Sequence, residues 1–163
     1  METRLPIRIG SGYDVHRFAP ERELWLGGVL IPFEKGLLGH SDADVLLHAI
    51  CDALLGALAL RDIGYHFPDT SEKFAGADSK ELLKEVNGMI QKEGYIIGNI
   101  DATIVAERPK INPHIPMMQE TIAQILDITP NQVSIKASTN EKLGAIGREE
   151  GIMALATTLL ITQ

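Results

Sequence analysis

The chain has 163 residues, of which 45% are hydrophobic and 23% are charged, and these values are typical of one globular domain spanning residues 1–163. The formal net charge is -7 and the Lys and Arg residues are scattered, which argues against a nucleic-acid partner because such proteins need a basic stripe. Cys51 is the single cysteine, so an intrachain disulfide is excluded. No stretch approaches the roughly 20 apolar residues of a membrane span, so we expect no membrane partner either.

The N-terminal half is predicted to contain a strand, a strand pair, a long helix and a loop. Residues 7–18 (IRIGSGYDVHRF) form the strand, and residues 24–33 (LWLGGVLIPF) form a shorter pair or hairpin arm with a Gly-Gly break. The helix is predicted from about 42 to 60. Residues 61–78 carry turn residues and are expected to form a long structured loop, a kind of segment that is often functional.

The C-terminal half is predicted to alternate between helices, strands and loops. In chain order these are an amphipathic helix at 79–94, a strand at 95–107, a proline-studded loop leading to a helix at 116–126, a strand at 132–139, a glycine-rich loop at 140–151 and a strand at 152–162. Ser79 is expected to cap the first of these helices, and Gly94 is expected to end it.

The element order β-β-α-α-β-α-β-β predicts an α/β fold (an α+β sandwich), in which helices pack on one face of a mixed β-sheet. The last strand is apolar or small on both faces, with Leu155 and Leu159 on one and Ala154 and Ala156 on the other. Strands inside a sheet also read this way. Since the helices can cover only one face, we expect an oligomer in which a second subunit covers the other.

Asp14 and His16 lie two residues apart on the first predicted strand, so their side chains point to the same face. Together with His48 from the long helix they offer one carboxylate and two imidazoles. This set suits catalytic zinc, which typically has three protein ligands. On spacing alone two interpretations stay open: a metal site, or a surface Asp–His pair with His48 hydrogen-bonded elsewhere.

The long helix has a well-marked start and a polar stripe. Ser41 is a good N-cap, and Asp42 and Asp44 suit the positive end of the helix dipole. Opposite the apolar face, Asp44, His48 and Asp52 are spaced i, i+4 and i+8. Such a stripe is most often a solvated face. This one contains no Lys or Arg, so the second interpretation is that the two acids orient the imidazole, as carboxylates do around metal-binding histidines.

Three further stretches suit a phosphorylated ligand. His40 and Ser41 stand at the start of the long helix, where free N–H groups favour an anion, with a simple helix cap as the alternative. In KASTNEKLG the hydroxyls suit phosphate and Glu141 suits a hard cation such as magnesium, with an ordinary strand-to-loop transition as the alternative. DIG (62–64) and FPDT (67–70) suit either polyol hydroxyls or plain turns.

Taken together, these stretches resemble one family. The chain is similar to the 2-C-methyl-D-erythritol 2,4-cyclodiphosphate synthases, the cyclising enzymes of the non-mevalonate isoprenoid pathway, in GYDVHRF, GGVLIPFEKGLLGHSDADVLLHAICDALLGAL, DIGYHFPDT, GADSKELL, GNIDATIVAERPK and KASTNEKLGAIGREEGI. The resemblance runs from about residue 7 to the C-terminus in the same order. The D-V-H, H-S-D-x-D-V-x-x-H, F-P-D-T and E-K-L-G blocks make it highly specific.

The resemblance implies a catalytic domain with two kinds of metal ion. The implied reaction converts 4-diphosphocytidyl-2-C-methyl-D-erythritol 2-phosphate into 2-C-methyl-D-erythritol 2,4-cyclodiphosphate. The 2-phosphate attacks the β-phosphorus and CMP leaves, so this phosphorus-oxygen lyase needs no protein nucleophile. Zinc is implied on Asp14, His16 and His48, and magnesium or manganese on Glu141.

The resemblance also assigns catalytic and substrate-binding positions. His40 and Thr139 match residues that stabilise the transition state. The implied substrate-binding residues are Asp14, Val15, His16, His40, Ser41, Asp62, Ile63, Gly64, Phe67, Pro68, Asp69, Thr70, Ser71, Ala106, Glu107, Arg108, Pro109, Lys110, Ile111, Asn112, Ala137, Ser138, Thr139, Asn140, Glu141, Ala145 and Arg148. Asp62, Gly64 and residues 67–71 match the methylerythritol pocket, and 106–112 with 137–141 match the cytidine and diphosphate contacts.

Members of the family are homotrimers with active sites between neighbouring subunits, so the resemblance implies sheets that face each other in a homotrimer. Tyr13 and Ala145 depart from the family pattern, since many members have Phe and a bulkier residue there. With Arg148 these positions surround a central cavity at the trimer axis that can hold an isoprenoid diphosphate.

Two other functions fit the residues less well: a zinc-dependent phosphodiesterase, in which metal-bound water attacks, and a trimeric nucleotide-binding module without activity. The implied partner is a cytidine diphosphate derivative. We expect a cytoplasmic protein, or a protein of the plastid stroma if the chain is a processed form.

Overall fold

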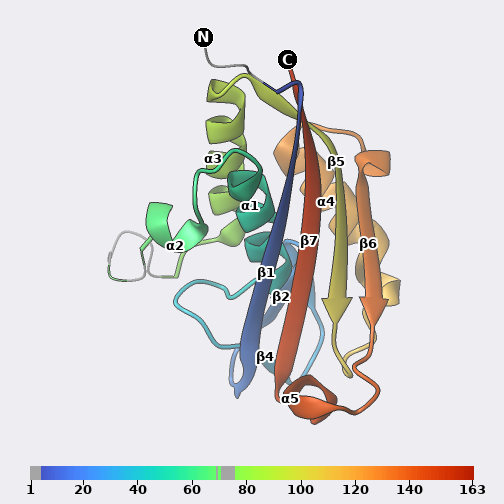
Figure 1. The fold of residues 1–163 in the computed structure, drawn as a ribbon. Helices are drawn as coiled ribbons and strands as arrows, with labels where there is room; N and C mark the ends of the chain where they lie inside the picture. The colour runs from blue at the N-terminus through green and yellow to red at the C-terminus, as the bar shows by residue number, and fades with distance from the viewer. Residues whose placement is uncertain (1–4, 69, 71–75) are drawn as a thin grey trace.

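The computed structural model of the chain describes residues 5–68, 70 and 76–163. Its centre is a five-stranded sheet in the order β4-β1-β7-β5-β6 (Figure 1). The strands are β1 (Ile7–Pro20), β4 (Lys35–Leu37), β5 (Tyr95–Val105), β6 (Val133–Ser138) and β7 (Gly151–Thr162). β5 and β6 run parallel and the other neighbours run antiparallel, so the predicted mixed sheet is confirmed.

Helices cover one face of this sheet, as predicted (Figure 1). α1 (Val45–Ala57) packs on β1 and β7, α3 (Ser79–Lys92) on α1 and β5, and α4 (Ile115–Leu126) on β6 and α3. The predicted strand pair is a hairpin of β2 (Leu24–Leu26) and β3 (Val29–Ile31), and it contacts α1 and α4. Among the described residues, no helix combines the length and the apolar character that crossing a membrane requires.

The start of α1 differs from the prediction. Its N-cap is Asp44, whose carboxylate accepts a hydrogen bond from the Leu47 N–H at 3.1 Å. Ala43 has a φ of 57°, a left-handed conformation that an α-helix cannot contain. The helix therefore begins later than predicted, and the prediction that Ser41 caps it is wrong.

The cap of α3 is also displaced by one residue. Asp78 is the N-cap, with its carboxylate accepting from the Lys80 N–H at 2.9 Å, whereas Ser79 is the first helical residue. Predicting Ser79 as the cap was therefore wrong, and its hydroxyl is free for another partner. At the other end Gly94 follows the helix with a φ of 74°, as a terminating glycine should.

Two predicted loops contain single helical turns, and the structure contains one strand, β4, that was not predicted. α2 (Ile63–His66) lies within 61–78, α5 (Gly144–Gly147) lies within 140–151, and short 3₁₀ turns occur at Asn112–His114 and Pro130–Gln132. The sequence does not predict β4, which pairs with the end of β1 at the sheet edge. Asp69 and Ser71, predicted in the first of these loops, lie outside the described residues.

Glycines on β1 let α1 lie directly against the strand. A Cβ built on Gly12 would meet the Ala49 carbonyl oxygen at 1.9 Å, and one on Gly10 would meet the Ala53 carbonyl oxygen at 1.9 Å. These partners are backbone atoms, so no side-chain movement could make room. The glycines thus determine how close the residues of α1 come to β1.

Close packing buries every residue of α1 except Asp52 and Gly56. Asp44 is 0% exposed and His48 is 6% exposed, while Asp52 is half-buried. The interpretation of this stripe as a solvated face is therefore wrong. Instead, polar side chains have been placed inside the protein, where each needs a partner.

The outer face of the sheet is apolar and exposed in the single chain. Side chains alternate along β1, so that Ile7, Ile9, Tyr13 and Val15 point away from the helices. On the neighbouring β7, Leu155 continues this patch, which reaches 67% exposure at Ile9. The expectation that the last strand presents apolar side chains on both faces is confirmed. No described element of the chain covers this outer face.

Candidate functional site

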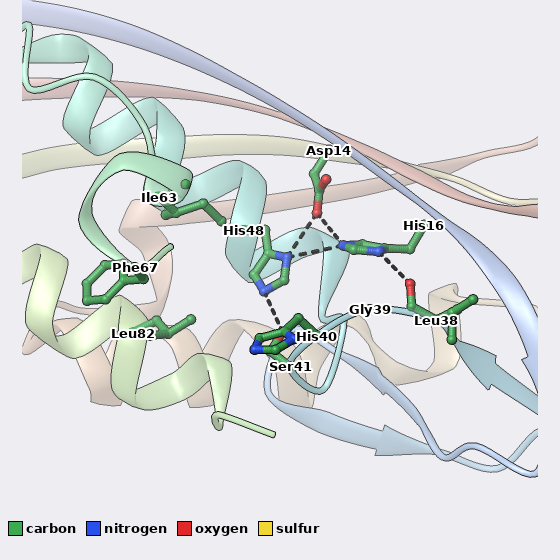
Figure 2. A pocket seen from close by; sticks show the side chains of 11 residues that line it. Asp14, His16, Leu38, Gly39, His40, Ser41, His48, Ile63, Phe67 and Leu82 are labelled. Atoms are coloured by element: carbon green, nitrogen blue, oxygen red, sulfur yellow. Dashed lines mark hydrogen bonds and ion pairs between the residues drawn. The ribbon is translucent and has the colours of Figure 1, made fainter. Parts of the chain in front are cut away.

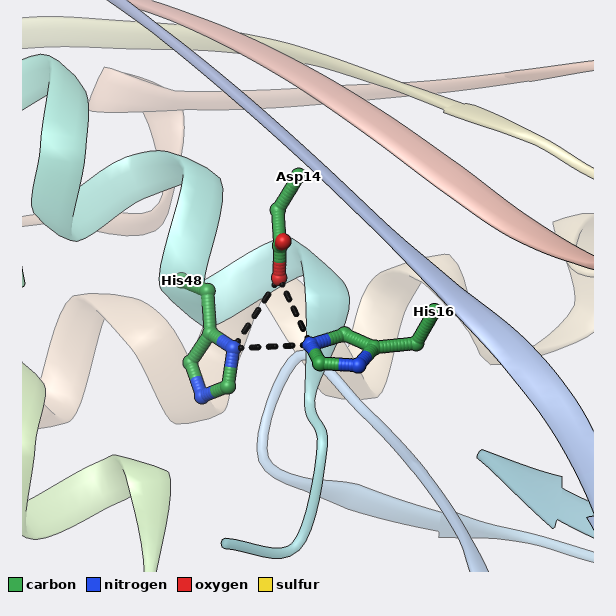
Figure 3. A group of neighbouring side chains, drawn as sticks. All are labelled: Asp14, His16 and His48. Atoms are coloured by element: carbon green, nitrogen blue, oxygen red, sulfur yellow. Dashed lines mark hydrogen bonds and ion pairs between the residues drawn. The ribbon is translucent and has the colours of Figure 1, made fainter. Parts of the chain in front are cut away.

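The three residues predicted to bind zinc lie together where α1 begins beside β1 (Figures 2 and 3). Asp14 and His16 project from the same face of β1, and His48 reaches them from α1. Asp14 Oδ2 lies 3.0 Å from His16 Nε2 and 3.0 Å from His48 Nδ1, and the two nitrogens are 3.3 Å apart. The alternative of a surface Asp–His pair with His48 elsewhere is therefore wrong.

These spacings fit a metal ion. In a tetrahedral zinc site with bonds of about 2.0–2.1 Å, neighbouring ligand atoms lie about 3.3 Å apart. One ligand atom from each of Asp14, His16 and His48 lies within 4.8 Å of the other two. Among the described residues, Glu141, the other predicted metal ligand, belongs to no such cluster. The structure thus offers one candidate metal centre made of one carboxylate and two imidazoles.

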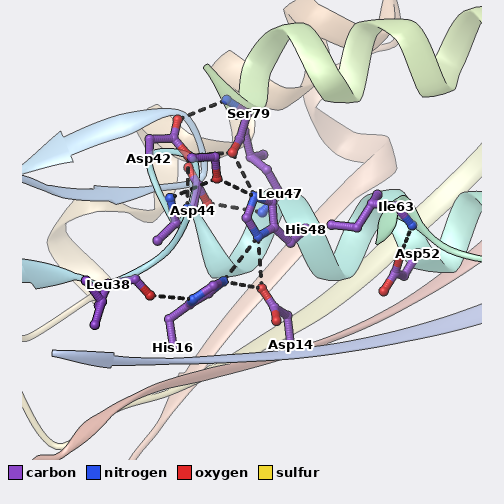
Figure 4. Close-up of polar contacts among 12 residues, drawn as sticks. Asp14, His16, Leu38, Asp42, Asp44, Leu47, His48, Asp52, Ile63 and Ser79 are labelled. Atoms are coloured by element: carbon purple, nitrogen blue, oxygen red, sulfur yellow. Dashed lines mark hydrogen bonds and ion pairs between the residues drawn. The ribbon is translucent and has the colours of Figure 1, made fainter. Parts of the chain in front are cut away.

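The remaining nitrogen of each imidazole has a partner that fixes the ring. His16 Nδ1 lies 2.8 Å from the Leu38 carbonyl oxygen, so Nδ1 is the protonated nitrogen and Nε2 is left for a metal. His48 Nε2 lies 2.9 Å from the Ser79 hydroxyl (Figure 4) and 3.3 Å from the Ser41 hydroxyl (Figure 2). Both rings therefore present their other nitrogen to Asp14.

Asp14 and His16 each shift the pKa of the other toward its charged form. Burial raises the pKa of the Asp14 carboxyl, but hydrogen bonds from His16 and His48 and their charges outweigh it and bring the pKa from 3.8 to about 2. Burial likewise lowers the pKa of His16, yet the hydrogen bond to Asp14 and the charge of Asp14 raise it above 6.5. At neutral pH Asp14 is therefore an anion that can act as a ligand.

Asp44 does not orient His48, contrary to the hypothesis from the stripe. Its carboxylate accepts hydrogen bonds from the N–H groups of Gly27 at 2.9 Å and Gly28 at 2.7 Å. These bonds hold the turn of the β2–β3 hairpin against the start of α1. Burial raises the pKa of Asp44, although the backbone N–H groups oppose this effect.

Asp52 positions α2 and does not contact the imidazole, so this part of the hypothesis is also wrong. Its Oδ1 accepts from the Ile63 N–H at 2.9 Å, and burial raises the pKa of the Asp52 carboxyl. Asp62 caps the same short helix through the Tyr65 N–H at 2.9 Å. Two carboxylates therefore hold the segment that was predicted to bind methylerythritol.

A pocket of about 260 Å³ opens beside the metal centre (Figure 2). It brings together many of the predicted residues, namely Asp14, His16, His40, Ser41, His48, Ile63, Gly64 and Phe67. Leu38, Gly39 and Leu82 also line it, and the sequence does not single them out because such residues read as ordinary core or turn positions. His40 and Ser41, which are expected to bind phosphate, thus share one cavity with part of the segment that is expected to bind the polyol.

A second pocket, of about 430 Å³, lies where β5 and β6 end. Its walls contain most of the residues predicted to bind cytidine and diphosphate, namely Ala106, Glu107, Pro109, Lys110, Ile111, Asn112, Ala137, Ser138 and Thr139, together with Pro113. Arg108 is not among them. Its guanidinium lies 5.4 Å from the centroid of the Phe33 ring.

The two pockets lie apart within one chain. They share no lining residue, and β7 and β5 separate β1 from β6 in the sheet. With neighbouring strands about 4.8 Å apart, β1 lies about 10 Å from β5 and about 14 Å from β6, the two strands whose ends bear the second pocket. A single chain therefore presents two separate pockets.

The loop after β6 is held by Glu107. Its Oε1 accepts hydrogen bonds from the N–H groups of Asn140 and Lys142, each at 3.0 Å. Glu141 and Lys142 have φ values of 50° and 61°, left-handed conformations that cost energy in residues other than glycine. The Glu141 N–H donates to the Thr139 hydroxyl at 3.3 Å, so the loop keeps these two predicted residues side by side.

Several predicted residues line neither pocket. The side chain of Val15 is exposed on the outer face of the sheet, and Ala145 is exposed on α5. Arg148 pairs with Glu150 through a bond of 2.6 Å from Nε to Oε1. Pro68 and Thr70 are exposed after α2. Their roles stay predictions.

Comparison with known proteins gives one consistent family. The model of the YgbB family matches residues 7–161. The 2-C-methyl-D-erythritol 2,4-cyclodiphosphate synthase of Parabacteroides distasonis is 59% identical over 156 residues, which cover 96% of this chain and 97% of the relative. The synthase of the same name from Nostoc sp. is 60% identical over 158 residues, covering 97% of this chain and 96% of the relative.

Solved structures are similar over nearly the whole chain. The bifunctional IspDF from Campylobacter jejuni superimposes with a TM-score of 0.93 at 44% identity, covering 96% of this chain and 42% of that longer one. A CDP complex of IspF from Plasmodium falciparum gives a TM-score of 0.87 at 38% identity and covers 99% of both chains. These IspDF and IspF structures thus share the mixed sheet with its covering helices.

Proposed function

The chain belongs to the YgbB family of 2-C-methyl-D-erythritol 2,4-cyclodiphosphate synthases, and from this premise we propose how its residues carry out the reaction. The enzyme cyclises 4-diphosphocytidyl-2-C-methyl-D-erythritol 2-phosphate. An oxygen of the 2-phosphate forms a bond to the β-phosphorus, the bond from that phosphorus to the oxygen bridging to the α-phosphate breaks, and CMP leaves with that oxygen. The observation that carries the proposal is the cluster of Asp14, His16 and His48 at the wall of a pocket.

Asp14, His16 and His48 would hold zinc, and the support is their spacing of 3.0 to 3.3 Å together with the fixed protonation of the outer nitrogens. When bound there, zinc supplies Lewis-acid polarisation of the β-phosphate. Glu141 would hold magnesium or manganese, which supplies charge neutralisation for the diphosphate. Glu141 is exposed on a loop that Glu107 holds, so its carboxylate is accessible to such an ion.

The protein groups position the substrate and stabilise charge. The nucleophile is tethered in the substrate, so holding it in line with the β-phosphorus provides most of the acceleration. His40 and Ser41, at the pocket wall, and Thr139, in the second pocket, would donate hydrogen bonds to phosphoryl oxygens whose charge grows in the transition state. Ile63, Gly64 and Phe67 would enclose the methylerythritol part.

We assign the cytidine to the second pocket, and we propose that the chain forms the homotrimer with active sites between subunits that the family resemblance implies. Within one chain, about 10 to 14 Å of sheet separates β1 from the two strands that bear the second pocket, while the substrate must reach both this pocket and the metal centre. A neighbouring subunit could bring its second pocket to this metal centre. The exposed apolar outer face of β1 and β7 supplies a surface for such assembly.

Phosphorus NMR of a reaction with zinc and magnesium tests the proposal. We expect the wild type to form cyclic diphosphate and CMP, and His48→Ala to be slower by about 100-fold or more because it loses a metal ligand. His114→Ala is the matched control, since His114 lines neither pocket, and it should keep the wild-type rate. A linear bisphosphate would indicate hydrolysis by water and contradict cyclisation. Binding of CMP without turnover would indicate a nucleotide-binding module instead.

A further inference from the structure

A serine and an aspartate from different elements hold the His48 ring on the side of Nε2, the nitrogen that faces away from Asp14. Its Nε2 lies 2.9 Å from the hydroxyl of Ser79, the first residue of α3. That hydroxyl donates to Asp42, and the Ser79 N–H donates to the other oxygen of the same carboxylate at 2.9 Å (Figure 4). Ser79 is 0% exposed and His48 is 6% exposed, so water does not replace these contacts.

The direction of each proton follows from the chemistry of the groups. A carboxylate accepts only, so the single proton of the Ser79 hydroxyl points to Asp42. The hydroxyl oxygen must then accept a proton from His48 Nε2, which leaves a lone pair on Nδ1. Nδ1 is the nitrogen that faces Asp14 at 3.0 Å. The chain of hydrogen bonds therefore selects the tautomer that a metal needs.

The Ser41 hydroxyl is a weaker alternative partner for the same nitrogen. It lies 3.3 Å from His48 Nε2, farther than Ser79, and it already accepts from the Ala43 N–H at 3.2 Å. Ser41 is also half-buried and lines the pocket, whereas Ser79 is enclosed. We therefore assign the ordering of the ring to Ser79.

We propose that Ser79 and Asp42 are positioning residues for the metal centre, acting through the imidazole of His48. The inference rests on the metal site of the proposed function and adds to it two residues that contact neither metal nor substrate. Asp42 precedes α1 and Ser79 begins α3, so the third metal ligand is correctly oriented only when these two segments dock. Partners of this kind typically contribute 10- to 100-fold to metal affinity.

Zinc affinity of the purified full chain, measured by competition with a chromophoric chelator, tests the proposal. We expect Ser79→Ala to bind zinc about 10- to 100-fold more weakly than the wild type and Asp42→Asn to be weakened in the same direction. Ser79→Thr keeps the hydroxyl and should recover most of the affinity. The visible spectrum of the cobalt-substituted protein should also change in Ser79→Ala, since the ring is free to turn.

Asp78→Ala is the matched structural control. It removes the side-chain cap of α3 at the residue before Ser79 and leaves His48 untouched, so it should lower the melting temperature and leave zinc affinity unchanged. Equal weakening by Asp78→Ala and Ser79→Ala would overturn the proposal, because the effect would then come from α3 as a whole. Unchanged affinity in Ser79→Ala would overturn it as well, while the metal site itself would stand.

Two further results separate this proposal from the metal site on which it rests. A wild-type protein that binds no zinc would remove the metal centre and the positioning role together. If Ser79→Ala does not fold, nitrogen NMR of the wild-type imidazoles at about pH 8 decides. A proton on His48 Nε2 supports the proposal, and a proton on Nδ1 contradicts it.

Discussion

Asp14 links the stability of the metal-free protein to pH. Burial raises the pKa of its carboxyl, but His16 and His48 outweigh burial and bring that pKa to about 2. The ionised Asp14 therefore stabilises the folded state above the ordinary pKa of 3.8, and this stabilisation is lost as pH falls through about 2. The pKa of His16 is raised above 6.5, because Asp14 outweighs the effect of burial. Its stabilisation is fully present below 6.5 and is lost as pH rises through the higher folded value. The pair therefore stabilises the metal-free fold most between about pH 4 and pH 6.5.

Asp14→Asn should reduce the free energy of unfolding more at about pH 5.5 than at about pH 9. A fall in pKa from 3.8 to about 2 corresponds to about 2.5 kcal/mol, and solvent screening at this partly exposed carboxylate lowers the expected loss to about 1–2 kcal/mol at the lower pH. Urea denaturation of metal-free protein at both pH values measures this difference. Asp101→Asn is the control: the pKa of Asp101 is lowered chiefly by its hydrogen bond with Lys136, and no histidine takes part, so its small loss should be the same at both pH values. An equal loss for Asp14→Asn at both pH values would refute the argument.

At this scale the sequence predicts the metal ligands better than their supports. Period-two alternation places Asp14 and His16 on one face, but the residues alone leave a site shared with His48 as one of two interpretations, because spacing does not reveal that α1 lies on β1. The sequence does not predict that Ser79 and Asp42 support His48. Both residue types are common near helix starts, so they are interpreted as ordinary helix-start residues, whereas the true caps are Asp78 and Asp44.

The packing of α1 on β1 is the element-scale counterpart of the metal centre. Gly12 lies under Ala49, the residue after His48, and a Cβ there would lie 1.9 Å from the Ala49 carbonyl oxygen and 2.8 Å from the Ala53 backbone nitrogen. Because both are backbone atoms, a side chain could be accommodated only by moving the helix. Such a shift would move His48 away from the two ligands on the strand.

Gly12→Ala should therefore weaken folding and zinc binding together. We expect a loss of about 3 kcal/mol in the free energy of unfolding from overpacking, and a zinc affinity at least about tenfold lower. Gly88→Ala on α3 is the matched control, since nothing lies within 4 Å of its new Cβ, and it should stabilise the helix by about 0.5–1 kcal/mol. Urea denaturation and chelator competition measure both effects. A Gly12→Ala protein with wild-type zinc affinity would show that this close approach does not determine the position of His48.

Elements that are long enough to show a repeating hydrophobic pattern are predictable from this sequence, whereas short elements are not. The strands at 95–107 and 132–139 alternate or run apolar for long enough to be recognised, and the structure places them within two residues of the prediction. α2 and α5 are single turns, too short for a 3.6-residue period to appear. β4 has the sequence KGL, and it is a strand only because the edge of β1 offers it hydrogen bonds.

At the scale of the whole molecule, the sequence indicates the layers but not the order of the strands. The alternation of β7 predicts two apolar faces, and the structure confirms one face against the helices and one exposed. The order β4-β1-β7-β5-β6 depends on long-range pairing that local patterns do not encode. That order separates the metal centre from the second pocket, and this separation is the reason for proposing that neighbouring subunits share a site.

Mixing two inactive variants tests whether neighbouring subunits share a site. His48→Ala damages the metal centre and Thr139→Ala damages the second pocket, so each protein alone should be nearly inactive. In randomly assorted homotrimers, each half of a site is intact with a probability of one half, so about a quarter of wild-type activity should return. Phosphorus NMR of a co-refolded equimolar mixture measures the recovery.

The matched control combines two lesions in the same half of the site. A mixture of His48→Ala with Asp14→Ala cannot assemble an intact metal centre from any pair of neighbours, so it should stay inactive. Recovery in the first mixture and none in the second requires that the metal centre of one chain works with the second pocket of another. If the first mixture also stays inactive while sedimentation shows mixed oligomers, both halves must come from one chain. The separation of the two pockets would then have to be closed by movement within that chain, and the apolar outer face would need another explanation.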